Sequence, residues 1–106
     1  MMATRKLLKK DSGANVRLQQ GDKLEIQLPE NATTGYKWVL ATLNDIRVKE
    51  NFQPAGAGNP GSGGTAIFEL APLKKFAARK IVLKYQRPWE TDVTPEDSFS
   101  ITLTVQ

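Results

Sequence analysis

The sequence predicts an all-β fold, an antiparallel sandwich of two sheets built from about seven strands. Three observations lead to this prediction. The chain has 106 residues, a length that suits one domain with one core, and we expect a single domain over residues 1–106. Apolar residues recur at every second position over most of the chain, which is typical of half-buried strands. No window long enough for a helix has the apolar stripe of an amphipathic helix.

The first three expected strands follow from this alternation in chain order. A valine and a leucine two positions apart predict a strand over 15–19. Leucine, isoleucine and leucine alternate with charged or amide residues and predict a second strand over 22–28. In the third strand, 36–42, Trp38 lies between other apolar positions of the same parity, so we expect its indole in the core.

The remaining four strands follow the same rule. An isoleucine and a valine around an arginine predict a strand over 46–52, and the strand expected over 65–71 is apolar enough to be more fully buried. Alternating apolar residues then predict strands over 80–86 and 98–105. We expect residues 1–12 to form a loose N-terminal segment.

Three connections are expected to share one end of the sandwich. If consecutive strands alternate in direction, the connections 29–35, 53–64 and 87–97 emerge together, and 43–45 and 72–79 emerge at the opposite end. This is an immunoglobulin-like arrangement. Binding residues concentrate on loops that a rigid scaffold positions, so the arrangement indicates a binding end.

The absence of two residue types excludes whole classes of chemistry. The sequence has no histidine and no cysteine, which removes Ser-His and Cys-His catalysis, the usual zinc sites and disulfides. The acidic residues of 87–97 supply carboxylates, but without a cleft we expect no acid–base catalysis. We therefore expect no enzyme activity, no catalytic residue, no metal site and no cofactor.

The charge pattern predicts a solvated basic face. The net charge is +4, and basic residues cluster in Arg5–Lys10 and Lys74–Lys84. Few aromatic residues are interleaved with them, which disfavours nucleic-acid binding. The first ten residues lack an apolar run long enough for a signal peptide or a membrane span. We expect a monomer that binds neither nucleic acid nor membranes, cytoplasmic as written, and periplasmic or secreted if a leader was removed.

Each of the three loops has an ordinary interpretation beside a functional one. Asn31–Tyr36 is either a simple turn or a turn that exposes backbone groups to a partner. Pro54–Gly64 holds five of the eight glycines and is either a connector or a mobile loop whose bare backbone approaches a partner. Its G-x-G-x-x-G match lacks the helix and the lysine of phosphate-binding loops. Trp89 is either a lid on the core or an anchor for a partner.

Taken together and in order, the loops resemble those of the chagasin family of cysteine protease inhibitors. The resemblance rests on Asn-x-Thr-Thr-Gly-Tyr at Asn31–Tyr36, Gly-x-Gly-Gly at Gly61–Gly64 and Arg-Pro-Trp at Arg87–Trp89. It implies a reversible, non-covalent inhibitor of papain-like cysteine proteases that occludes the active-site cleft with the three loops. The protease-binding residues that it implies are Asn31, Thr33, Thr34, Gly35, Tyr36, Gly61, Gly63, Gly64, Arg87, Pro88 and Trp89.

The resemblance also implies how the loops dock. Thr33 lies nearest the catalytic cysteine, the glycine-rich loop follows the substrate groove, and Trp89 packs on aromatic residues of the protease. Where the family has proline after the asparagine, this chain has Ala32, which restrains the unbound loop less and lowers the expected affinity. From the residues alone, an immunoglobulin-like adhesion or carbohydrate-binding module that uses the same loops is the alternative.

Overall fold

A computed structural model describes residues 3–31, 35–41, 43–54, 63–90 and 94–106. Its elements, in chain order, are β1 (Thr4–Leu8), the 3-10 helix η1 (Lys9–Asp11), β2 (Asn15–Leu18), β3 (Lys23–Glu30), β4 (Lys37–Leu40), β5 (Ile46–Pro54), β6 (Gly64–Pro72), β7 (Phe76–Gln86) and β8 (Asp97–Val105). Within these residues, no helix has the length and apolar character needed to cross a membrane.

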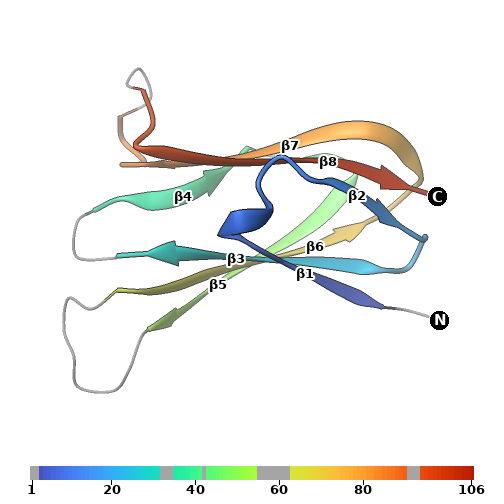
Figure 1. Ribbon diagram of the computed structural model, residues 1–106, viewed down its shortest axis with the longest axis horizontal. Helices are drawn as coiled ribbons and strands as arrows, with labels where there is room; N and C mark the ends of the chain where they lie inside the picture. Colours follow the sequence, from blue (N-terminus) through green and yellow to red (C-terminus); the bar gives the residue numbers. More distant parts are fainter. Residues whose placement is uncertain (1–2, 32–34, 42, 55–62, 91–93) are drawn as a thin grey trace.

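Two four-stranded sheets pack face to face (Figure 1). The strand order is β1-β3-β6-β5 in the first sheet and β2-β8-β7-β4 in the second. The predicted all-β sandwich is therefore confirmed, and the described residues form eight strands in place of about seven. It is also not wholly antiparallel, because β1 pairs in parallel with β3, and β2 pairs in parallel with β8.

Strand β1 corrects the expectation of a loose N-terminal segment. It pairs with β3 from Thr4 opposite Lys23 to Leu8 opposite Gln27. Within β1, Leu7 is buried and the other residues are exposed. An edge strand with a single inward side chain has no alternating apolar pattern, so the sequence offers no sign of it.

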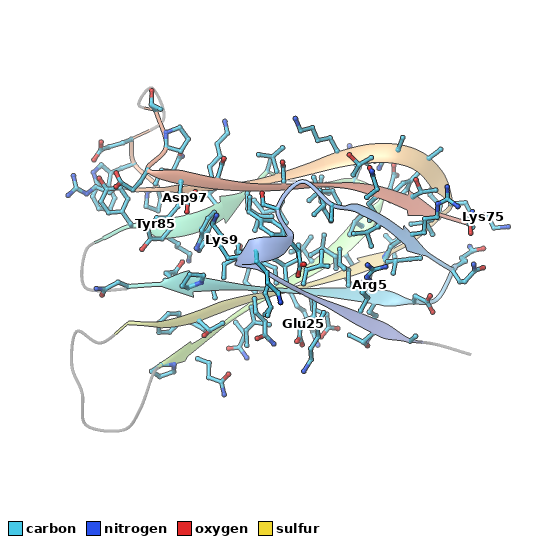
Figure 2. The ribbon with its side chains drawn as sticks, in the orientation of Figure 1. Arg5, Lys9, Glu25, Lys75, Tyr85 and Asp97 are labelled. Atoms are coloured by element: carbon cyan, nitrogen blue, oxygen red, sulfur yellow. The ribbon has the colours of Figure 1, made fainter. Side chains whose placement is uncertain are left out.

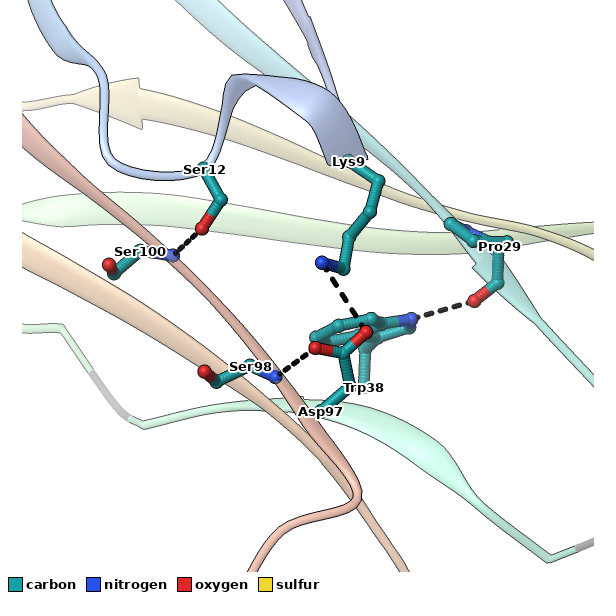
Figure 3. Close-up of polar contacts among 7 residues, drawn as sticks. All are labelled: Lys9, Ser12, Pro29, Trp38, Asp97, Ser98 and Ser100. Atoms are coloured by element: carbon teal, nitrogen blue, oxygen red, sulfur yellow. Dashed lines mark hydrogen bonds and ion pairs between the residues drawn. The ribbon is translucent and has the colours of Figure 1, made fainter.

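The core fills the space between the sheets. Its buried side chains are Leu7, Val16, Leu18, Leu24, Ile26, Leu28, Trp38, Ile46, Ala66, Phe68, Leu70, Ile81, Leu83, Phe99, Ile101, Leu103 and Val105. The predicted core position of Trp38 is confirmed, since its side chain is 1% exposed. Its indole N–H donates to the Pro29 carbonyl oxygen at 2.8 Å (Figure 3), which satisfies a donor that would otherwise destabilise the core by about 1–3 kcal/mol.

Several strand boundaries differ from those expected. Strand β7 begins at Phe76, earlier than the expected start at 80. The sequence did not indicate this start because a shift of register between Phe76 and Arg79 interrupts the alternation by which a strand is recognised. Ala78 has φ +48° in this bulge. Strand β3 continues to Glu30 and β5 to Pro54, so the loops that follow them are shorter than predicted.

The two basic runs are mostly exposed, as expected of a solvated face. Among the basic residues of these runs, Lys9 and Arg79 are half-buried, and both pair with carboxylates. Arg79 contacts Asp45 at 2.8 Å, and Lys9 contacts Asp97 at 3.3 Å. The hydrogen bond from Arg79 lowers the pKa of Asp45 below its ordinary value.

The predicted sharing of one end by three connections is confirmed. Strands β3 and β5 both run antiparallel to β6, and β4 and β8 both run antiparallel to β7. The ends of β3, β5 and β7 and the starts of β4, β6 and β8 accordingly lie at the same side, on the left in Figure 1. We call this side, with the described residues that flank its three loops, the loop end.

Candidate functional site

Most of the predicted site residues are described by the structure, and these come together at the loop end. They are Asn31, Gly35, Tyr36, Gly63, Gly64, Arg87, Pro88 and Trp89. Thr33, Thr34 and Gly61 lie outside the described residues. Tyr85, which the sequence analysis did not include, lies at this end, whereas Lys75 lies at the opposite end (Figure 2).

An aromatic column runs from the core to the loop end. The ring of Trp38 lies 5.0 Å from that of Tyr85, and Tyr85 stacks on Tyr36 with centroids 5.6 Å apart. The Arg87 guanidinium lies over the Tyr36 ring, 4.8 Å from its centroid. Stacked rings and a cation over an aromatic face are favourable contacts. The column therefore connects the first and third loops to a buried side chain.

The third loop begins with a tight turn that projects Trp89. The Glu90 N–H donates to the Arg87 carbonyl oxygen at 3.0 Å, and Pro88 occupies the position at which a β-turn favours proline. The Arg87 side chain also pairs with the Glu90 carboxylate at 3.1 Å. That hydrogen bond, together with the electrostatic effect of Tyr36, raises the pKa of Arg87 above its ordinary value.

Trp89 does not cover the core. Its side chain is 70% exposed, which contradicts the interpretation of Trp89 as a lid. Part of its ring lies against Gly35, where an added Cβ would be 3.2 Å from the Trp89 Cη2 atom. Gly35 also has φ +80°, a conformation that favours glycine. Glycine at this position lets the first loop turn and lets the tryptophan approach it.

The bases of the first and second loops also lie together. A Cβ on Gly63 would lie 3.9 Å from Asn31 and 3.4 Å from the Glu30 carbonyl oxygen. The Asn31 N–H donates to the Tyr85 hydroxyl oxygen at 3.2 Å. A shallow hollow of about 270 Å³ lies where the two loop bases meet; its lining residues are Pro29, Glu30, Asn31, Gly63, Gly64 and Tyr85.

Gly64 allows two backbones to approach each other where β6 begins. It pairs with Pro54 of β5, and a Cβ at Gly64 would lie 2.5 Å from the Gln53 carbonyl oxygen and 2.6 Å from the Phe52 Cζ atom. Any larger residue would push these groups apart. Phe52 precedes the second loop and is 37% exposed. It is not part of the Gly-x-Gly-Gly motif, so the sequence analysis did not include it among the site residues.

Comparisons with known proteins point to one family. Residues 17–103 match the chagasin family peptidase inhibitor I42. Chagasin of Trypanosoma cruzi is 30% identical over 105 residues, which cover 92% of this chain and 94% of chagasin. Amoebiasin-2 of Entamoeba histolytica is 28% identical over 106 residues, which cover 94% of this chain and 84% of amoebiasin-2.

Solved structures agree with these sequence matches. The crystal structure of the cysteine protease inhibitor EhICP2 from Entamoeba histolytica has a TM-score of 0.87 and 28% identity, and the match covers 99% of this chain and 97% of EhICP2. A second similar chain comes from a structure of PbICP-C in complex with falcipain-2, with a TM-score of 0.67, 21% identity and coverage of 97% and 98%. At that identity the second likeness is one of fold.

Proposed function

The chain belongs to the chagasin family of peptidase inhibitors, and from that membership we propose that its loop end occupies the active-site cleft of a papain-like cysteine protease. The chain is thus an inhibitor of cysteine proteases and not an enzyme. Its lack of histidine and cysteine agrees with this function, because inhibition by occlusion needs no nucleophile or general base of its own. Family membership also decides against the adhesion or carbohydrate-binding alternative.

The observation that carries the docking proposal is that the described residues flanking the three loops converge at the loop end. Residues separated in sequence, such as Gly35 and Trp89 or Asn31 and Gly63, lie in direct proximity. The aromatic column joins this surface to buried Trp38. Flanking residues held in this way lose little conformational freedom when the loop end binds, which favours affinity.

The proposed mechanism is occlusion without covalent chemistry. The first loop enters the cleft with Thr33 nearest the catalytic cysteine, and the glycine-rich loop and Trp89 lie on either side of it. The first loop is tied to β3 and β4 at its two ends. We expect that this attachment prevents it from extending as a substrate does and from presenting a carbonyl group to the nucleophile in an attack geometry. An interface of standard size, roughly 800 Å² per partner, is sufficient for such a complex.

The test of this function is an inhibition assay. We expect the chain to inhibit papain reversibly, with activity restored on dilution, and to leave trypsin unaffected at the same concentration. Recovery of the inhibitor from the mixture with its chain intact supports occlusion over cleavage. Full papain activity at micromolar inhibitor would refute the proposal, and equal inhibition of trypsin would refute its specificity.

A further inference from the structure

We propose that Glu30 and Tyr85 are positioning residues of the first loop, which fix both of its ends before a protease binds and thereby determine inhibitory strength. This inference rests on the proposed function. Neither residue belongs to the loop motifs. Both are identified by their contacts in the structure, which join the start of the loop to its end.

The loop needs such residues because of its place in the topology. It leaves β3 in the first sheet and enters β4 in the second. Strand β3 pairs with β1 and β6, and β4 pairs with β7. A β-hairpin loop is closed by the ladder of its own two strands, but no ladder joins the strands that flank this loop. Other contacts have to hold its ends together.

Glu30 supplies the first of these contacts. Its carboxylate Oε1 accepts the backbone N–H of Trp38 at 2.8 Å. Strand β4 is at the edge of its sheet, so a side of its backbone without a strand partner is available to this carboxylate. Hydrogen bonds to a charged acceptor are stronger than neutral ones. The indole N–H of Trp38 donates in return to the Pro29 carbonyl oxygen at 2.8 Å, so two hydrogen bonds join the end of β3 to β4.

Tyr85 supplies the second contact from the neighbouring strand. Its hydroxyl accepts the Asn31 N–H at the start of the loop, and its ring stacks on Tyr36 at the end of the loop. Tyr85 itself lies on β7 opposite Trp38. One side chain thus touches both ends of the loop and is held in place by the core.

Fixing the ends matters more in this chain than it would with a stiffer loop. Ala32 leaves the backbone after Asn31 without the restraint on φ that proline imposes. A loop with fixed ends still has fewer conformations to lose on binding than one with free ends. Glu30 and Tyr85 therefore act on affinity through the loop, without needing to contact the protease.

The test compares four variants in the papain assay. Glu30→Ala should raise the inhibition constant about tenfold, whereas Glu30→Gln, which keeps an acceptor oxygen, should stay within about threefold of the wild type. Tyr85→Phe keeps the ring and loses the hydroxyl, and should raise the constant about fivefold. Glu25→Ala is the matched control: Glu25 lies on the same strand and accepts a hydrogen bond from Gln27 at 2.7 Å, away from the loop. It should leave the constant unchanged.

Amide hydrogen exchange of the free chain gives a readout independent of inhibition. The Trp38 amide should exchange faster in Glu30→Ala than in Glu30→Gln, and the Asn31 amide should exchange faster in Tyr85→Phe. The inference would be overturned if Glu30→Ala and Tyr85→Phe both had the wild-type inhibition constant. It would also be overturned if Glu30→Gln inhibited papain as weakly as Glu30→Ala. If Glu30→Ala fails to fold, Tyr85→Phe decides the question. If the wild type fails to inhibit papain, the proposed function is wrong, and the exchange rates alone decide whether these side chains order the loop.

Discussion

Replacing Trp89 with alanine is expected to weaken protease binding by about 2 kcal/mol or more, about thirtyfold in Kd, while the melting temperature stays nearly unchanged. The side chain is 70% exposed in the free chain, so its removal leaves no cavity in the core. On binding, a tryptophan presented by a fixed turn buries a large apolar surface at little cost in conformational entropy. Isothermal calorimetry with papain and thermal unfolding of the free variant measure the two quantities.

Trp38→Phe is the matched control, because Trp38 is the other tryptophan in the sequence. It is 1% exposed, so replacing the indole with the smaller phenyl ring should lower the melting temperature, because the change leaves a cavity and removes the hydrogen bond to Pro29. We therefore expect Trp89→Ala to lower the affinity for papain and Trp38→Phe to lower the melting temperature. A large fall in melting temperature for Trp89→Ala with unchanged affinity would show that Trp89 has a structural role and is not an anchor.

Replacing Thr33 with arginine is expected to have the larger effect, a loss of about 3 kcal/mol or more, on the order of a hundredfold in Kd. In the proposed complex Thr33 is enclosed between the loop tip and the floor of the cleft. A long cation there would overpack the contact and would lose hydration without a partner. Dissociation constants for papain measure the change.

Thr33→Ala is the control for this variant. It should cost little, because the contact at this position comes mainly from the backbone and from shape. If Thr33→Arg binds as tightly as the wild type, the first loop does not enter the cleft and the proposed docking is wrong. If Thr33→Ala loses as much affinity as Thr33→Arg, the threonine hydroxyl is recognised specifically, which the occlusion mechanism does not predict.

Much of the fold could be predicted from the sequence because most strands bury one face. Alternation around Leu24 and Leu103 reports a strand with one side in the core, and chain direction then places three loops together. Strand β1 was not predicted because Leu7 is its one buried residue. The start of β7 was not predicted because a bulge near Ala78 interrupts the alternation of apolar and polar residues. In both cases the backbone pairs without the side-chain pattern that would reveal the pairing.

The candidate site divides in the same way. Glycines and a tryptophan in polar loops stand out in a sequence, so Gly35 and Trp89 could be identified from the motifs. Glu30 and Tyr85 could not, because a glutamate at a strand end and a tyrosine in an alternating strand are ordinary residues. Their importance lies in hydrogen bonds to Trp38 and Asn31, which depend on how two sheets meet in space.

The most direct test of cleft occlusion is binding to papain whose groove is already filled. Papain can be inactivated in two ways, with a small alkylating group on the catalytic cysteine or with a peptidyl inhibitor that also spans the substrate groove. We predict that the chain binds the first form, weakened only by crowding, because no covalent step contributes to the complex. We predict no binding to the second form, measured by calorimetry. Undiminished binding to the groove-filled protease would contradict the claim that the loop end occupies the active-site cleft.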